Sequence, residues 1–229
     1  MYEYTYKDAL DSKIISNLTI INRGIQLGKP EKRKLAELDA KIRAGIQEYQ
    51  TFENLIDSSK KMDFKAMGIL RQMNARKKIY NNSLLKMKAV VEDIQKYSDK
   101  IIVFNEYKTM ADKLYMELKK KNIPVWLYHS GTKKKDYNPI EEFTLAPSGV
   151  LVTVRALDEG LNVKDASRAF LIGYNSTNRQ AIQRVGRIIR GQQNKHSYIH
   201  NYYFLETKDK DNAVSFSNIF KDIATIQWL

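Results

Sequence analysis

The sequence contains no cysteine, and this absence excludes disulfide bonds and thiolate metal sites. Its three histidines, His129, His196 and His200, show no metal-ligand spacing with a carboxylate partner, so we predict no metal site. No run of roughly 18 apolar residues occurs, and the N-terminus lacks a signal-peptide pattern. We therefore expect a soluble intracellular protein, in the cytoplasm or nucleoid, with no membrane partner.

Acidic residues are few relative to basic ones. The 229 residues include 39 Lys and Arg against 26 Asp and Glu, which gives a formal net charge of +13. An excess of this size favours a polyanionic partner such as nucleic acid, although each basic run taken singly is typical of a solvated face. The hydrophobic content of 43% suffices for a full core, and the length indicates one or two domains.

From Lys100 onward, short apolar segments alternate with amphipathic ones. We expect strands at residues 101–104, 125–128, 150–154 and 169–172, and near 199–205. Helices are expected over residues 110–118, near 136–143, over 178–189, and at the C-terminus over 214–228. This alternation predicts an α/β fold with a doubly wound parallel sheet and crossover helices.

Residues 30–99 carry a helical pattern instead. Apolar side chains recur every three or four residues over 35–56 and again over 69–94. We interpret this region as an N-terminal helical hairpin or insertion; the alternative is an accessory arm that touches nucleic acid or a partner. Residues 1–29, with a short predicted strand at 18–21, are interpreted as a connector.

Polar and small residues follow several of the predicted strands. Asn105 lies at the end of the first, residues 129–132 (HSGT) at the end of the second, and residues 153–160 at the end of the third. Ligands of doubly wound sheets bind beyond the carboxyl ends of the strands, where small residues let backbone amides approach phosphate groups. For His129 by itself, a structural hydrogen bond is an equally good interpretation.

The stretch QRVGRIIR, residues 183–190, is predicted to lie on the helix over 178–189. Its polar side chains share one face of that helix: Gln180, Gln183, Arg187 and Arg190. Its aliphatic side chains share the opposite face: Ile182, Val185 and Ile189. We expect the aliphatic face to pack on the sheet, with Gly186 permitting close approach, and the guanidinium groups to face an anion. A solvated polar face is the alternative.

QxxGRxxR in residues 183–190 resembles motif VI of superfamily 2 helicases and translocases, and VTVRALDEGLNV in residues 152–163 resembles their motif V. The chain looks most like helicases of the xeroderma pigmentosum B type and phage recombination helicases. Two positions depart from the pattern: Val154 stands where many relatives have Thr, and Asn162 where many have Asp. The resemblance implies that residues 100–229 form the second RecA-like domain of an ATP-dependent motor.

The resemblance also implies roles for the matching positions. Arg187 and Arg190 are expected to act as arginine fingers on the γ-phosphate of ATP. Other residues expected at the nucleotide are Gln183, Glu159, Gly160 and Asn162. Residues expected to face the nucleic-acid backbone are Asn105, His129, Gly131, Thr132, Thr153, Val154 and Arg155.

The sequence lacks the GxxxxGK[ST] phosphate loop and the acidic pair that such a motor needs for magnesium. We therefore expect ATP and Mg²⁺ to be bound mainly by a separate first RecA-like domain, in cis or in trans, and this chain alone to be inactive. Because its motif order begins at motif IV, it resembles the second half of a longer motor. DNA is the expected nucleic acid, rather than RNA.

Two other functions stay open. One is a non-enzymatic nucleic-acid-binding subunit that has a RecA-like fold. It accounts for the charge and the missing phosphate loop, but leaves GRIIR without a purpose. The other is an unrelated doubly wound enzyme with a glycine-rich phosphate loop, although no such loop follows the predicted strand at 101–104.

Overall fold

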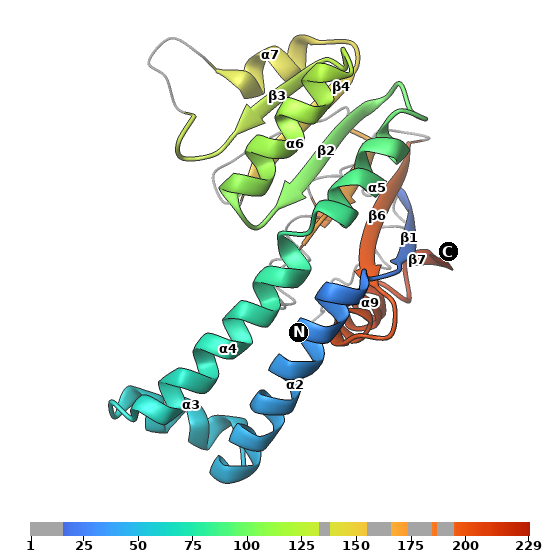
Figure 1. Cartoon of the computed structure of the whole chain (residues 1–229). Helices are drawn as coiled ribbons and strands as arrows, with labels where there is room; N and C mark the ends of the chain where they lie inside the picture. Colours follow the sequence, from blue (N-terminus) through green and yellow to red (C-terminus); the bar gives the residue numbers. More distant parts are fainter. Residues whose placement is uncertain (1–15, 133–137, 155–165, 174–184, 187–194) are drawn as a thin grey trace, which may run out of the picture.

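The chain is built around a seven-stranded sheet in which each strand runs parallel to its neighbours (Figure 1). This computed structural model describes residues 16–132, 138–154, 166–173, 185–186 and 195–229. The strand order is β3-β4-β2-β5-β6-β1-β7. The strands are β1 (Asn17–Ile25), β2 (Lys100–Asn105), β3 (Val125–Tyr128), β4 (Gly149–Val154), β5 (Arg168–Leu171), β6 (His196–Phe204) and β7 (Ala224–Trp228). The predicted α/β fold with a doubly wound parallel sheet is confirmed.

Helices cover both faces of the sheet. Those that pack on it are α5 (Leu84–Ile94), α6 (Lys108–Lys120), α7 (Pro139–Leu145) and α9 (Lys208–Ile219), and the helices α2 (Lys29–Tyr49), α3 (Phe52–Lys60) and α4 (Phe64–Asn81) precede them in the chain. Successive side chains of a strand point to opposite faces. Accordingly, Ile102 and Phe104 of β2 join a core cluster that includes residues of α7 and α9, whereas Ile101 and Val103 join a second cluster with α5 and α6. Burial on both faces explains why β2, β4 and β5 read as continuous apolar runs.

Three helices form an arm that extends away from the sheet (Figure 1). α2 and α4 run alongside each other, and α3 packs on both at the far end, where Leu55 is fully buried. At the root of the arm, Leu35 of α2 and Tyr80 of α4 pack with Phe204, the last residue of β6. The predicted helical hairpin is therefore present as an arm seated on the sheet.

The arm contains more helices than the apolar pattern predicted. The helix expected over 35–56 is interrupted at Gln50, whose φ of 65° is not helical, and Thr51 then caps α3 by accepting from the Asn54 N–H. The stripe over 69–94 is likewise divided, because the Ser83 side chain accepts the first N–H groups of α5. These serine and threonine caps start new helices within a continuous apolar pattern.

Both ends of the chain contribute strands to the sheet. The strand expected at 18–21 is longer, and β1 lies between β6 and β7. The helix expected over 214–228 is wrong in its second half: α9 ends at Ile219, and β7 pairs with β1, with Ile20 opposite Ile226. Pairing along the edge of β1 supplies backbone hydrogen bonds that a helix would have to make internally. The division of the chain at residues 29 and 99 stays a prediction.

Buried ion pairs join the helices to the strands. The Lys86 ammonium of α5 lies 2.6 Å from the Asp209 carboxylate of α9, with both side chains buried. Asp93 of α5 accepts a hydrogen bond from the Tyr202 hydroxyl at 2.5 Å and pairs with Arg23 of β1. Burial alone would raise the pKa of Asp93, but the hydrogen bonds from its partners, Arg23 first, leave it below its usual range.

Candidate functional site

Six of the predicted site residues lie in the described part of the chain, and all six are at one edge of the sheet. β4 lies between β3 and β2, with Thr153 opposite both Tyr128 and Phe104, and Val154 opposite Asn105. Parallel strands end at the same edge, so the turn that begins at His129 follows β3 beside these residues. The structure thus gathers six residues that are far apart in sequence: Asn105, His129, Gly131, Thr132, Thr153 and Val154.

Two of these residues carry buried polar atoms without partners. Asn105 is 1% exposed, and among the described residues neither its amide nitrogen nor its amide oxygen has a hydrogen-bond partner; the Thr153 hydroxyl is equally unpaired. Thr153 lies on the sheet face of Phe104, and Asn105 on the face of Val154. A buried unpaired polar group costs roughly 1–3 kcal/mol. Unpaired groups of this kind at the carboxyl ends of β2 and β4 fit a ligand that the chain alone does not contain.

The turn over residues 129–132 is held by its own hydrogen bonds. The Gly131 N–H donates to His129 Nδ1 at 3.0 Å, and the Thr132 N–H donates to the His129 carbonyl at 2.9 Å. The Thr132 hydroxyl donates to the same carbonyl at 2.8 Å and accepts from the His129 N–H at 3.0 Å. The donors expected to approach phosphates from Gly131 and Thr132 are therefore used within the turn.

His129 makes structural hydrogen bonds on both sides of its buried ring. Nδ1 accepts from Gly131, so in a neutral ring the proton is on Nε2, which lies 2.9 Å from the Asp112 carboxylate on α6. No sequence pattern points to Asp112, because this contact spans 17 residues and joins a helix to a turn.

The remaining predicted residues lie outside the described part of the chain: Arg155, Glu159, Gly160, Asn162, Gln183, Arg187 and Arg190. Two neighbours of the predicted fingers are described. Val185 is 1% exposed and lies in the core cluster with Phe104, as its predicted place on the aliphatic face requires. The expectation that Gly186 permits close approach is wrong for this chain alone, since a side chain there would meet no atom within 4 Å. Neighbouring helical residues are rotated by about 100°, so Gly186 faces away from the sheet side that Val185 contacts.

A second polar cluster lies at the opposite, amino edge of the sheet, and none of its residues was predicted as a site residue. The Arg168 guanidinium at the start of β5 donates to the Asp99 carboxylate at 3.2 Å and to His200 Nε2 at 2.9 Å, and stacks 3.6 Å from the Tyr97 ring centroid. Burial, and then the positive charge of Arg168, lower the pKa of His200 to about 4. Every member of this cluster has a partner, so it fits a structural role.

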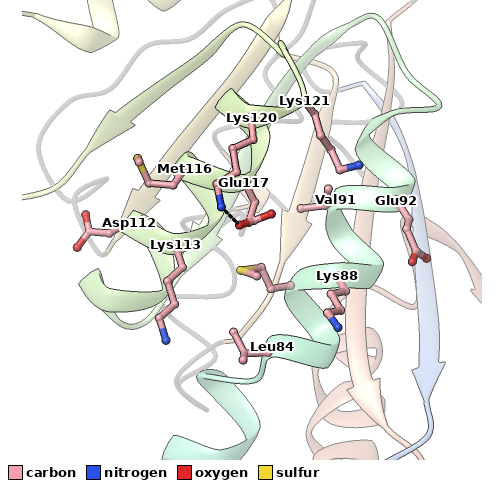
Figure 2. Close-up of a pocket in the computed structure, with 11 residues that line it drawn as sticks. Leu84, Lys88, Val91, Glu92, Asp112, Lys113, Met116, Glu117, Lys120 and Lys121 are labelled. Atoms are coloured by element: carbon pink, nitrogen blue, oxygen red, sulfur yellow. Dashed lines mark hydrogen bonds and ion pairs between the residues drawn. The ribbon is translucent and has the colours of Figure 1, made fainter.

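A hollow of about 740 Å³ lies between α5 and α6 (Figure 2). Leu84, Val91 and Met116 line it among several lysines, and it contains none of the predicted site residues. No group of three His, Asp or Glu side chains among the described residues could hold a metal ion. Of the helices that the structure describes, none combines the length and apolarity needed to cross a bilayer.

An all-parallel sheet covered on both faces, with unpaired polar groups at the carboxyl ends of β2 and β4, is a doubly wound α/β domain with a candidate ligand site at that edge. Residues 85–192 match the model of the helicase conserved C-terminal domain.

One curated protein is similar to most of this chain. The chain is 29% identical over 191 residues to the DNA 3'-5' translocase XPB2 of Sulfurisphaera tokodaii, an alignment that covers 80% of this chain and 42% of the relative. The chain therefore spans less than half the length of that protein.

Two solved structures share the fold at low sequence identity. The C-terminal domain of the DEAD-box protein Dbp5 has a TM-score of 0.54 at 20% identity, covering 65% of this chain and 86% of that one. The Hef helicase domain of Pyrococcus furiosus has a TM-score of 0.64 at 15% identity, covering 93% of this chain and 60% of that one. At these identities the similarity bears on the fold alone, and it agrees with the predicted RecA-like domain.

Proposed function

We propose that the chain is the second motor domain of an ATP-dependent DNA translocase or helicase and works with a separate first RecA-like domain. The first domain binds most of the ATP and Mg²⁺, and this chain completes the site and contacts the DNA backbone. The observation that carries the proposal is the helicase C-terminal match over residues 85–192, which includes QRVGRIIR. The relative named as a DNA translocase supports DNA rather than RNA.

On the nucleotide side, Arg187 and Arg190 are the proposed arginine fingers. Phosphoryl transfer depends on positioning and on stabilising charge, and the planar guanidinium group binds phosphate oxygens in pairs. The burial of Val185 in the core supports a segment whose aliphatic face packs on the sheet. The other residues proposed to line the nucleotide are Gln183, Glu159, Gly160 and Asn162.

On the nucleic-acid side, the proposal rests on the edge formed by β3, β4 and β2. The unpaired atoms of Asn105 and Thr153 are groups that a bound ligand could satisfy, and the net charge of +13 favours a polyanion. The other residues proposed to face the backbone are His129, Gly131, Thr132, Val154 and Arg155. Contacts with phosphates position a protein on nucleic acid without reading its sequence, so binding should depend on salt and tolerate any sequence.

The test is ATP turnover with and without a first RecA-like domain. The chain alone should show no nucleic-acid-stimulated turnover, because its sequence lacks the phosphate loop. In the two-domain motor, Arg187→Lys and Arg190→Lys should each lower kcat by about 100-fold or more, since lysine keeps the charge but not the paired geometry. Arg43→Lys, on the exposed surface of α2, is the matched control and should leave kcat unchanged.

DNA affinity without ATP separates the competing functions. It should hardly change in the Arg187 and Arg190 variants if these residues act on ATP. If the lysine variants keep full turnover while DNA affinity falls, the fingers are phosphate-backbone contacts and the chain is a binding subunit. Turnover by the chain alone would contradict the need for a separate first domain.

A further inference from the structure

The turn over residues 129–132 leaves one residue exposed with its polar groups unused. We propose that Ser130 is the residue of this turn that contacts a nucleic-acid phosphate, and that His129 and Asp112 are positioning residues that hold it in place. The proposal rests on the nucleic-acid binding proposed above. Within this turn, the proposed phosphate contact is therefore Ser130 rather than His129, Gly131 or Thr132.

The hydrogen bonds of the turn single out Ser130. The N–H groups of His129, Gly131 and Thr132 all donate within the turn. Ser130 is exposed, and in the described part of the chain neither its N–H nor its hydroxyl has a hydrogen-bond partner. An N–H and a hydroxyl on one residue can both donate to phosphate oxygens.

The position of Ser130 matches the rest of the edge. Tyr128, two residues earlier, lies opposite Thr153 in the sheet, so the turn lies beside the unpaired hydroxyl of Thr153. Three lysines follow the turn directly in the sequence, at residues 133–135. A donor at the apex of a fixed turn, beside a buried unpaired hydroxyl, suits a ligand that presents oxygen acceptors along a strand.

His129 and Asp112 fix the geometry of the turn. The imidazole spans it from inside, with Nδ1 accepting from Gly131 and Nε2 facing the Asp112 carboxylate. A side chain at position 131 would lie 3.1 Å from His129 Cε1, so the ring and the turn are packed tightly together. Asp112 is 53% exposed, and its carboxylate contacts the ring from α6, outside the turn.

The negative charge of Asp112 lets the direction of the change in nucleic-acid affinity distinguish two explanations. A carboxylate near a phosphate-binding edge repels the ligand, so simple electrostatics predicts that Asp112→Ala binds nucleic acid more tightly. A positioning role predicts weaker binding, because the ring loses its contact with α6 and the turn loosens. Glu117→Ala is the matched control: it removes a carboxylate from the same helix without touching His129.

The contact itself is tested by titrating the full chain with a fluorescent DNA oligonucleotide at low salt. Ser130→Asp should weaken binding by about 10-fold or more, because it places a carboxylate against the phosphate. Ser130→Ala should weaken it by about 3-fold, as expected for one lost hydrogen bond. Ser98→Asp, an exposed serine at the amino edge before β2, is the matched control and should change affinity less than about 2-fold through long-range charge.

The positioning role is tested in the same titration and by ¹⁵N NMR of the His129 ring. Asp112→Ala should weaken binding by about 3-fold. Asp112→Asn, whose amide oxygen can still accept from Nε2, should recover the lost affinity. Because Gly131 donates to Nδ1 in every variant, the ring should stay the Nε2–H tautomer, and the Nε2 resonance should shift in Asp112→Ala, which lacks the acceptor, but not in Asp112→Asn.

Each failure points to a different conclusion. If the wild-type chain shows no salt-dependent binding, the proposed function fails and the Ser130 contact fails with it. If the wild type binds but Ser130→Asp behaves like Ser98→Asp, the contact alone is overturned. If Asp112→Ala binds more tightly, as Glu117→Ala should, or leaves the Nε2 resonance of His129 unchanged, the positioning role is overturned.

Discussion

The two edges of the sheet treat their buried polar groups in opposite ways. At the amino edge, Arg168 bonds both Asp99 and His200, and Thr19 of β1 bonds His196 of β6 at 2.8 Å. At the carboxyl ends of β2 and β4, Asn105 and Thr153 are buried without partners. Both edges are polar by sequence, so composition does not separate them. Hydrogen-bond pairing separates the two edges. Folding is more stable when buried polar groups are hydrogen-bonded, whereas a binding site must keep some polar groups unpaired for its ligand.

This difference also shows where perturbed electrostatics is a poor guide to function. His200 has the strongly lowered pKa, yet it lies at the amino edge with a stacked Phe170 ring 4.4 Å away and a guanidinium on its Nε2. Structural networks perturb pKa values as active sites do. The candidate site is supported instead by unpaired atoms that coincide with the carboxyl ends of β2 and β4, those of Asn105 and Thr153.

The largest expected effect is the loss of the amino-edge cluster. Arg168→Met keeps the apolar stem but removes the donors to Asp99 and His200, and should lower the free energy of unfolding by about 3 to 4 kcal/mol. Urea unfolding measures this change. Arg33→Met, which removes an exposed ion pair with Glu37, is the control and should have little effect. Equal changes in the free energy of unfolding for the two substitutions would show that the cluster does not stabilise the fold.

A smaller effect is expected from pH. The folded pKa of His200 is about 4 against an ordinary value of 6.5, so the unfolded chain takes up its proton first as the pH falls. Stability should therefore decrease between pH 6.5 and about 4, by up to about 3 kcal/mol from this group. His200→Gln keeps a neutral acceptor for Arg168 and should remove most of that slope in urea unfolding at pH 7, 5.5 and 4.5, values chosen roughly to span the window. A slope unchanged in His200→Gln would assign the pH dependence to other groups.

The smallest expected effect is a change in the free energy of unfolding that has opposite signs at the two edges. Thr153→Val removes an unpaired hydroxyl and should raise the free energy of unfolding by about 1 kcal/mol, while Thr19→Val removes a partner of His196 and should lower it by about as much. In the two-domain motor, Thr153→Val should reduce DNA-stimulated turnover. Destabilisation by Thr153→Val as large as that by Thr19→Val would mean that the two edges do not differ.

Much of the sheet could be predicted from sequence because its central strands are buried on both faces. The strand at 125–128 was predicted with the observed bounds, and those at 150–154 and 169–172 to within one residue at either end. The arm was predicted as helical, but its breaks were not, since Ser83 and Thr51 act through local caps inside an unbroken apolar pattern. β7 was missed because an edge strand shows no continuous apolar run and depends on a partner about two hundred residues away.

The candidate site was predictable only in part, for the same reason. Asn105, His129 and Thr153 could be predicted because each lies at the carboxyl end of a strand, and the topology of a parallel sheet brings such positions together. Asp112 could not be found, because its role depends on how α6 packs beside the turn.

The α/β class, the polarity of the candidate edge and the resemblance of residues 152–163 and 183–190 to helicase motifs follow from the sequence, because they depend on local pattern and spacing. Which polar groups are paired depends on the three-dimensional packing. Pairing is a property of contacts between distant segments: the Asn22 side chain of β1 accepts from Asn201 and donates to Ser217, whereas the Asn105 side chain of β2 has no partner in the described part of the chain. The same asparagine side chain is satisfied in the first place and available in the second, and no local pattern distinguishes the two.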